Sequence, residues 1–151
     1  MQSDKQIIVL KFDENDLPAV DEIDRWLRGG FQVVVVSGDS DLTALSLAQR
    51  LGGACRLIKN VDGLYTGDPN ANPSARRFAR VSYATAARVG GAVVQRTAID
   101  FAQRHHLKFT VSSVGSACAT EVGPYAALAD LFDVRHEWIP NQTTAEQERL
   151  A

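Results

Sequence analysis

The stretch that decides the fold runs Leu57-Ile58-Lys59-Asn60-Val61-Asp62-Gly63-Leu64-Tyr65-Thr66-Gly67-Asp68-Pro69. It begins as an apolar strand, turns at Asp62-Gly63 and ends in a loop closed by Pro69. This pattern predicts a backbone cradle at the end of a sheet strand, where open α/β sheets bind ligands. An ordinary turn is the alternative, because most Asp-Gly pairs are only turns. The surroundings of the stretch have to decide between the two interpretations.

Upstream of this stretch, apolar runs alternate with helical patterns. The strand-like runs are residues 7–12, 32–36 and 55–61. One helix between them carries Val20, Ile23 and Leu27 at helical spacing and ends at Gly29-Gly30; the other carries Leu42, Leu45, Ala48 and Leu51 and ends at Gly52-Gly53. Short connections between alternating strands and helices predict a parallel sheet.

Downstream, the same reading continues with shorter elements. Ser82 is expected to cap a short helix, a longer helix carries Ala98, Ile99 and Ala102, and residues 108–112 form a strand. A helix is expected over residues 125–132. No linker divides the chain, so residues 1–140 are predicted to form a single domain and residues 141–151 a polar tail.

Composition narrows the class of protein. The 151 residues are 45% hydrophobic and 23% charged with a net charge of −2, which does not indicate a nucleic-acid or membrane surface. The polar N-terminus has no signal-peptide core, and we expect a cytoplasmic protein. Cys55 and Cys118 lie far apart without metal-ligand spacing, so no metal site is expected. Free buried thiols are the favoured interpretation, with a disulfide as the alternative.

Taken in order, the motifs resemble the amino acid kinase family, which includes aspartokinase, acetylglutamate kinase and bacterial uridylate kinase. The resemblance rests on Asp39-Ser40-Asp41-Leu42-Thr43-Ala44, on Val61–Pro69, on Gly90-Gly91 and on Ala119-Thr120-Glu121-Val122, and it is most similar to aspartokinase. It covers residues 35–122 and implies an α/β three-layer sandwich with a mainly parallel sheet. This version is reduced, because the middle piece that carries much of the acceptor-substrate site in the family is absent.

The resemblance also implies a site. Family members transfer the γ-phosphoryl group of ATP to a carboxylate or phosphate, which requires lysines, close backbone N–H groups and Mg²⁺. Lys11 and Asp41 fall at the family's catalytic positions, although a solvated lysine and a helix N-cap are the structural alternatives. The implied nucleotide-binding residues are Lys59, Asn60, Asp62, Gly63, Tyr65 and Asp68.

Several departures from the family pattern weaken the phosphate site. Asp13-Glu14 replaces a glycine pair, and each carboxylate repels phosphate by on the order of 1–4 kcal/mol at a partly exposed position. The family's lysine near Gly90-Gly91 is also absent. A Mg²⁺ ion held by Asp13, Glu14 and Asp41 would restore phosphate binding. We therefore expect a nucleotide-binding protein, taking ATP or ADP with Mg²⁺, whose phosphotransferase activity is weak or lost.

Two alternatives stay open: an active small-carboxylate kinase completed by oligomerisation, and a non-catalytic assembly or regulatory module. Missing strands should leave a sheet edge or apolar face that needs cover, so a homo-oligomer or a partner protein is expected. Three other groups are given structural roles. Trp26 and Trp138 are expected to pack, Arg76-Arg77 to lie in a solvated loop, and His105-His106 to end a helix without binding metal.

Overall fold

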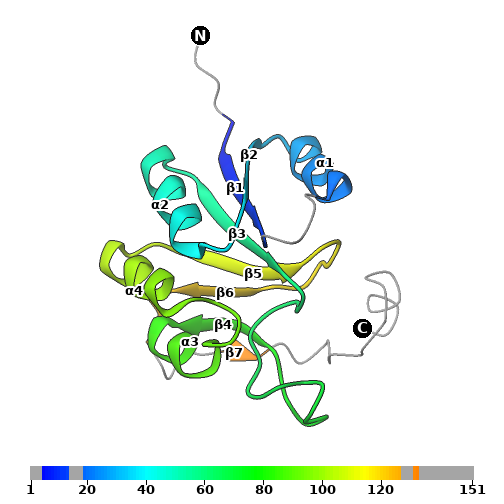
Figure 1. Cartoon of the computed structure of the whole chain (residues 1–151), viewed down its shortest axis with the longest axis vertical. Helices are drawn as coiled ribbons and strands as arrows, with labels where there is room; N and C mark the ends of the chain where they lie inside the picture. Colours follow the sequence, from blue (N-terminus) through cyan, green and yellow to red (C-terminus); the bar gives the residue numbers. More distant parts are fainter. Residues whose placement is uncertain (1–4, 14–18, 127–130, 133–151) are drawn as a thin grey trace.

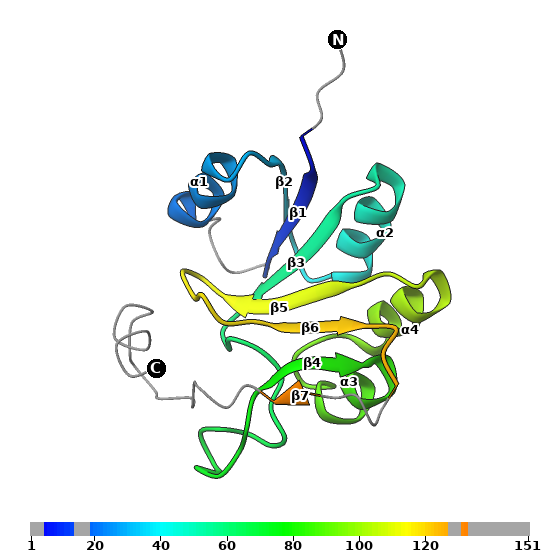
Figure 2. The same cartoon turned by 180° about the vertical axis from the view of Figure 1, so that it is seen from behind.

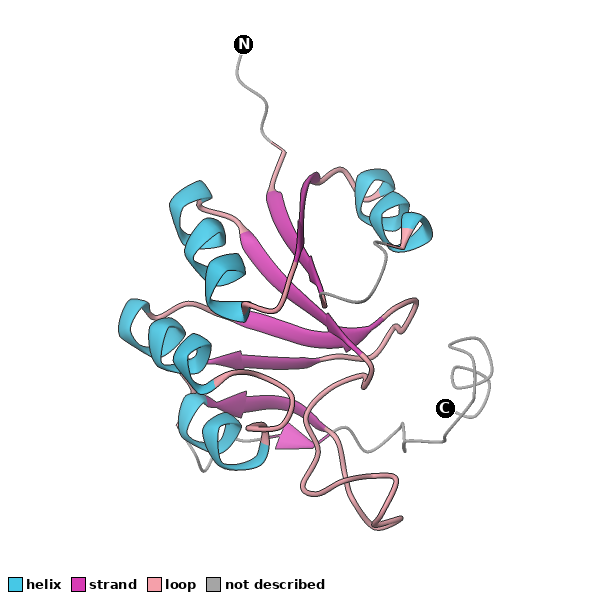
Figure 3. Ribbon diagram, viewed as in Figure 1, coloured by secondary structure: helices cyan, strands magenta, loops and turns pink. Residues whose placement is uncertain are grey.

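Strands and helices alternate along the first part of the chain, as its hydrophobic pattern predicts (Figures 1 and 3). The computed structural model describes residues 5–13, 19–126 and 131–132. Its strands are β1 (Ile7–Phe12), β2 (Gln32–Ser37), β3 (Ala54–Lys59), β4 (Phe78–Ser82), β5 (Phe109–Ser113), β6 (Thr120–Gly123) and β7 (Leu131–Phe132). Its helices are α1 (Val20–Arg28), α2 (Asp41–Leu51), α3 (Tyr83–Val89) and α4 (Arg96–His105).

The strands form one sheet in the order β2-β1-β3-β5-β6-β4-β7. β2, β1, β3 and β5 run parallel to one another. β6 is antiparallel to β5 and parallel to β4, and β7 pairs antiparallel with β4. The expected mainly parallel sheet is therefore confirmed, with its antiparallel pairs confined to the half that follows β5.

Helices cover the two faces of the sheet unequally, which gives three layers (Figures 1 and 2). Alternate residues of a strand point to opposite faces. Ile8, Leu10 and Phe12 pack under α1, whereas Val9 belongs to the larger core beneath α2, α3 and α4. On the face with α1, that helix lies over the β1–β2 end of the sheet.

The order of the strands reverses at β1, and this positions the site. β1 lies between β2 and β3, while α1 and α2, which lead into those neighbours, lie on opposite faces. In open α/β sheets such a reversal leaves a crevice outside the carboxyl ends of the strands. Residues that follow or end β1, β2 and β3 therefore meet at one edge.

Several expectations about individual elements are wrong. Val20 and Leu27 were expected on the apolar face of α1, but their side chains are 76% and 52% exposed, and the buried residue of that helix is Glu22. Residues 131–132 form β7 instead of ending a helix, because they pair with β4. The short strands β4 and β6 were not predicted from sequence, since each is too brief to show a periodicity.

Other expectations are confirmed. Ser82 caps α3 by accepting a hydrogen bond from the backbone N–H of Thr85 (3.1 Å). Cys55 and Cys118 are both buried and free, and burial, together with the negative charge of Asp41, raises the pKa of the Cys55 thiol to about 12. The predicted polar tail, residues 141–151, lies outside the described residues, as do Glu14 and Trp138. No helix in the described part of the chain is long and apolar enough to cross a bilayer.

Candidate functional site

Two lysines lie at the carboxyl ends of neighbouring strands, on the same face of the sheet. Lys11 lies beside Leu57 in the pairing of β1 with β3, and Lys59 ends β3 two residues later. Because side chains alternate, Lys11 shares a face with Val9, and Lys59 shares it with Leu57, which is the face that α2 covers. Lys11 is 1% exposed despite its charge, so its ammonium group needs a buried partner.

Asp41 supplies that partner from the first turn of α2. Its Oδ1 lies 3.0 Å from the Lys11 Nζ and 2.9 Å from the Lys59 Nζ, and its side chain is 1% exposed. The helix is capped by Ser40, whose hydroxyl accepts a hydrogen bond from the Thr43 N–H at 3.1 Å. The alternative role of Asp41 as the N-cap is therefore wrong, and its carboxylate is available to the lysines.

Gln95, the residue before α4, holds the start of α2 in place. Its side-chain Oε1 accepts from the Asp41 N–H (3.0 Å), its Nε2 donates to the Asp39 carbonyl (2.8 Å), and its own N–H donates to the Asp41 carboxylate (3.2 Å). Sequence reasoning missed this residue. The available signal was a polar residue between a Gly-Gly pair and a helix, at a position where an amide can bridge two loops.

Asp13 is the fourth charged residue of this cluster, and its carboxylate limits how an anion could reach the two lysines. Its Oδ1 lies 2.8 Å from the Lys11 Nζ and 3.2 Å from the Lys59 Nζ, and its side chain is 40% exposed. Burial by itself would lower the pKa of Lys11, but hydrogen bonds to Asp13 and Asp41 outweigh it and raise that pKa. Burial would likewise raise the pKa of Asp13, yet the hydrogen bond from Lys11 and the charge of Lys59 lower it.

The four side chains of Lys11, Lys59, Asp13 and Asp41, hereafter the ionic site, balance two positive charges with two negative ones. Two ammonium groups held about one carboxylate form an arrangement that can bind an anion such as phosphate, because lysines act as point charges on phosphate oxygens. In this chain Asp13 contributes an oxygen between the same two ammonium groups. An incoming anion would have to displace that carboxylate.

The Asp-Gly turn of the motif forms a second, separate cluster. Asp62 is 1% exposed; its Oδ1 accepts from the Tyr65 hydroxyl and its Oδ2 from the Arg77 guanidinium, both at 2.7 Å. Burial, the charge of Asp62 and its hydrogen bond all raise the pKa of Tyr65, which therefore keeps its proton. Arg77 is 1% exposed, so the expectation of a solvated loop is wrong for this residue, although Arg76 is exposed.

Close packing around this Asp62–Tyr65–Arg77 network requires a glycine at position 63. Its φ is +155°, and a Cβ there would lie 2.5 Å from the Thr120 Oγ1 and 2.8 Å from the Arg77 Cδ. Thr120 approaches because its hydroxyl accepts from the Leu64 N–H at 2.8 Å. The Val-Asp-Gly motif thus fixes the loop against β4 and β6.

The predicted site residues therefore fall into three groups. Lys11, Asp41 and Lys59 come together in the ionic site. Asp62, Gly63 and Tyr65 lie in the buried network, so a nucleotide would meet this segment through its backbone and its exposed side chains. Asn60 and Asp68 are exposed, and the Asp68 carboxylate accepts from the Asn70 N–H (2.9 Å). Nucleotide binding by all these residues stays a prediction.

The residues present do not form a cage for Mg²⁺. Among the described residues, no three Asp, Glu, His or Cys side chains gather around one point. Asp13 and Asp41 both face lysines, and Glu14, the third residue considered for such an ion, lies outside the described residues. Protein sites often hold Mg²⁺ with only one or two carboxylates and let substrate phosphates and water supply the other ligands. An Mg²⁺ ion here would accordingly arrive with a nucleotide.

Comparison with known proteins identifies the class. The model of the amino acid kinase family matches residues 7–112, which is most of the chain, so the chain belongs to this family. A uridylate kinase of Rhodopseudomonas palustris is 35% identical over 100 residues, covering 62% of this chain and 42% of that protein. An aspartokinase of Corynebacterium efficiens is 34% identical over 80 residues, covering 50% of this chain and 19% of that protein.

Solved structures show the same fold. The UMP kinase from Bacillus anthracis superposes with a TM-score of 0.55 at 19% identity, covering 87% of this chain and 62% of that chain. The aspartate kinase from Synechocystis superposes with a TM-score of 0.53 at 23% identity, covering 88% of this chain and 27% of that chain. The expected amino acid kinase fold is confirmed. The chain spans less than half the length of these curated relatives, and in it β2 passes to α2 through residues 38–40 alone.

Proposed function

We propose that this chain binds ATP or ADP at the carboxyl ends of β1 and β3, with Lys11 and Lys59 contacting phosphate oxygens, and that it transfers the phosphoryl group weakly or not at all by itself. The observation that carries the proposal is the pair of ammonium groups held about 3 Å from one buried carboxylate at a sheet edge. The family includes proteins named for phosphorylation of UMP and aspartate, which supports a nucleotide as the ligand. Such a role suits a cytoplasmic protein.

Asp13 is the reason for expecting weak binding. Its carboxylate occupies the space that a phosphate oxygen would take between Lys11 and Lys59. Removing it should expose both ammonium groups and leave the ionic site with one surplus positive charge. The proposal therefore makes an asymmetric prediction, in which loss of a lysine weakens nucleotide binding and loss of Asp13 strengthens it.

Calorimetric titration with ATP and ADP, with and without Mg²⁺, tests this prediction. We expect binding that Lys11→Ala and Lys59→Ala each weaken by about tenfold or more, the factor that roughly 1.4 kcal/mol represents. Lys5→Ala is the matched control, because Lys5 is an exposed lysine before the opposite end of β1. Asp13→Gly should tighten binding. No binding to the wild type or to Asp13→Gly at millimolar nucleotide would overturn the proposal.

A second function is favoured by the free edge of the sheet. β2 reads Gln-Val-Val-Val-Val-Ser, carries no charge and pairs on one side with β1; across the described residues it has no second neighbour. An uncharged edge strand of this length is a template for pairing with another chain. A second copy paired antiparallel along β2 would place two ionic sites on one continuous sheet and would complete an active carboxylate kinase.

Light scattering joined to an ADP-release assay with aspartate and related carboxylates separates these functions. Val35 is 39% exposed on β2, so Val35→Lys should block edge pairing without entering the core. Turnover in a wild-type dimer that Val35→Lys abolishes would establish the second function. A stable dimer that neither binds nor turns over nucleotide would indicate an assembly module. A monomer at high concentration would exclude pairing through β2.

A further inference from the structure

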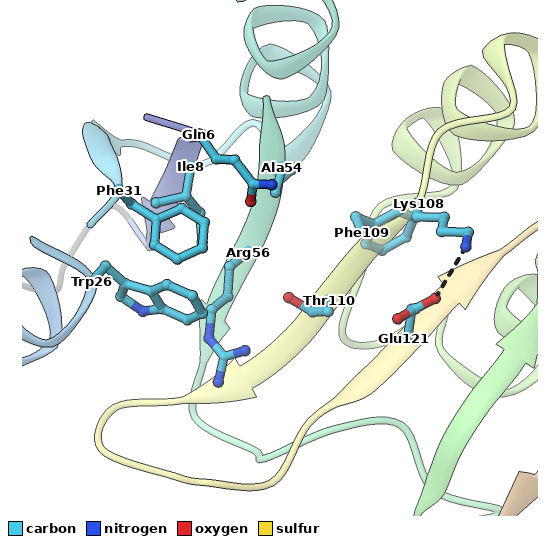
Figure 4. A pocket seen from close by; sticks show the side chains of 11 residues that line it. Gln6, Ile8, Trp26, Phe31, Ala54, Arg56, Lys108, Phe109, Thr110 and Glu121 are labelled. Atoms are coloured by element: carbon cyan, nitrogen blue, oxygen red, sulfur yellow. Dashed lines mark ion pairs between the residues drawn. The ribbon is translucent and has the colours of Figure 1, made fainter. Parts of the chain in front are cut away.

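A hollow of about 260 Å³ opens on the face of the sheet that carries α1 (Figure 4), whereas the ionic site lies on the face that α2 covers. It lies near Gln6, Ala54 and Phe109, which stand at the amino ends of β1, β3 and β5, whereas the ionic site is at their carboxyl ends. α1 covers β1 and β2 but leaves this part of the sheet open. No part of the proposed phosphate chemistry uses it.

One wall of the hollow is aromatic. Trp26 and Phe31 pack edge to face, with ring centroids 5.1 Å apart and planes at 81°, and Ile8 lies beside them. Across the hollow, Thr110 and the pair of Lys108 with Glu121 (3.9 Å) form the opposite side. Apolar walls with few polar groups are typical of small-molecule sites, and this volume suits a single ring rather than a nucleotide.

Arg56 places a buried positive charge in the hollow. The residue is 7% exposed, its guanidinium lies 5.2 Å from the centre of the Trp26 ring, and its Nε–H finds no hydrogen-bond acceptor within the described part of the chain. The carboxylate paired with it is that of Glu22, whose Oε1 is 3.6 Å from that Nε. Burial lowers the pKa of Arg56 to about 10, so the group stays charged at neutral pH.

Glu22 does not neutralise this charge by itself. Its carboxylate also accepts from Arg25 (3.0 Å), from the Trp26 indole (3.4 Å) and from the Gly115 N–H (3.0 Å). Among the described residues one carboxylate therefore serves two guanidinium groups, those of the buried Arg56 and of Arg25, which is 42% exposed; this leaves one positive charge in excess, while Lys108 and Glu121 balance each other. Water can reach the Arg25 guanidinium, so the group that calls for an opposite charge is the buried Arg56, whose Nε–H lacks an acceptor.

We propose that this hollow binds a small organic monoanion, a carboxylate carried on an aromatic or similarly apolar body. The body would lie against Trp26 and Phe31, and the carboxylate would accept the free Nε–H of Arg56. A single negative charge matches the single surplus charge, whereas a phosphate dianion would leave a net negative charge in a largely apolar site. The site is independent of the ionic site, so nucleotides should not compete for it.

Fluorescence of Trp26 tests the proposal directly. In a Trp138→Phe background, Trp26 is the one remaining tryptophan of the chain. Phenylacetate should change its emission saturably, 2-phenylethanol should bind about tenfold more weakly or worse, and phenethylamine should not bind, because charge pairing to a buried guanidinium contributes more than about 1.4 kcal/mol. Equal response to the acid and the alcohol, or no response at about 10 mM, would overturn the proposal.

Two variants and a control locate the site. Thr110→Phe should fill the hollow and abolish binding while leaving every ion pair of Arg56 intact. In Arg56→Gln the acid and the alcohol should bind about equally well. Arg50 is an exposed arginine near the end of α2, and Arg50→Gln should leave the binding of both compounds unchanged. Circular dichroism shows whether Arg56→Gln folds. If it fails to fold, Thr110→Phe decides alone, and phenylacetate binding that survives Thr110→Phe would contradict the proposal.

Discussion

The ionic site and the Asp62–Tyr65–Arg77 network both centre on a carboxylate that is 1% exposed, yet they differ in what surrounds it. Asp41 faces two lysines at the carboxyl ends of neighbouring strands, and its surroundings open outward through Asp13, whose side chain is 40% exposed. Asp62 faces a tyrosine and an arginine that are themselves buried. The first cluster can exchange one of its anions with solvent, and the second cannot do so without unfolding locally.

This difference separates two uses of a motif. The Val-Asp-Gly segment is the most recognisable part of the chain. Its aspartate and glycine hold the loop against β4 and β6. The less conspicuous lysines and Asp41 form the group that can meet a ligand. Motif similarity alone therefore points to the scaffold as readily as to the chemistry. Five substitutions test whether the two clusters differ in this way.

Arg77→Met should have the largest effect. It leaves the buried Asp62 carboxylate without its guanidinium partner, and breaking a buried ion pair in this manner costs about 3–5 kcal/mol of unfolding free energy. Urea denaturation measures the loss. The double variant Asp62→Asn with Arg77→Met should recover part of the stability, and Arg76→Met, at the exposed neighbour, is the control. A cost no greater than that of the control would show that the network is not structural.

Gly63→Ala should come next. The new methyl group would lie 2.5 Å from the Thr120 Oγ1, so either Thr120 or the loop has to move, at a cost of about 1–3 kcal/mol. Thermal unfolding measures the change. Gly67→Ala is a matched control four residues away, because the nearest atom to a Cβ there is 3.8 Å distant. Equal melting temperatures for the two variants would contradict the close packing.

Ser40→Ala should reduce stability less than these two substitutions, and it acts next to the ionic site. The substitution removes the N-cap of α2 and should cost about 0.5–2 kcal/mol, because the Thr43 N–H loses its acceptor. Chemical denaturation gives the value, and calorimetric titration shows whether nucleotide binding changes with it. If stability is unchanged, Asp41 has turned to cap the helix, and nucleotide binding should fall because its carboxylate has left the lysines.

Asp13→Asn should have the smallest effect at neutral pH and a distinct effect in acid. The folded pKa of Asp13 lies below its ordinary value of 3.8, so the residue stabilises the fold above that pH and loses its contribution as pH falls through the folded value. The acid limb of a plot of stability against pH should be shallower in the variant below about pH 4. Asp39→Asn, on the exposed turn before α2, is the control. Identical acid limbs in wild type and Asp13→Asn would show that Asp13 does not pair with the lysines.

The same pairing predicts an alkaline effect at Lys11. Its folded pKa is raised above 10.5, so its ion pairs stabilise the fold below that pH and are lost as pH rises through the folded value. Lys11→Met should flatten the alkaline limb of the stability profile. Lys5→Met, at an exposed lysine, should leave that limb as in the wild type.

Long patterns were the predictable part of the fold. The three apolar runs at residues 7–12, 32–36 and 55–61 became β1, β2 and β3, and the glycine after α2 ends that helix with φ of +66°, as a helix-ending glycine should. Strands of four or five residues, such as β6 and β4, carry too few positions to reveal an alternation. The predicted apolar face of α1 was wrong because Val20 and Leu27, although at helical spacing, lie on a face of the helix that the fold leaves in solvent.

The candidate site was predictable only in part, because several of its residues gain their roles from partners that are distant in the chain. Lys11 and Asp41 were found by resemblance, and Lys59 was placed near the nucleotide without any sign that it would share Asp41 with Lys11. Gln95 and Arg56 were missed, because each gains its role from a partner far away in the chain: Asp41, 54 residues from Gln95, and Glu22, 34 residues from Arg56. Arg77 looked like a loop arginine until the fold brought Asp62 to it.

The sequence by itself determined the family, the order of the first three strands and the residues that end them, because local hydrophobic pattern and motif order suffice for these. Only the tertiary structure decided which charges meet. The reversal of strand order at β1 brings Lys11, Lys59 and Asp41 to one edge, and the packing of β4 and β6 seals Asp62 away. Ion pairing and burial depend on distances between segments remote in the chain, and such distances exist only after the chain has folded.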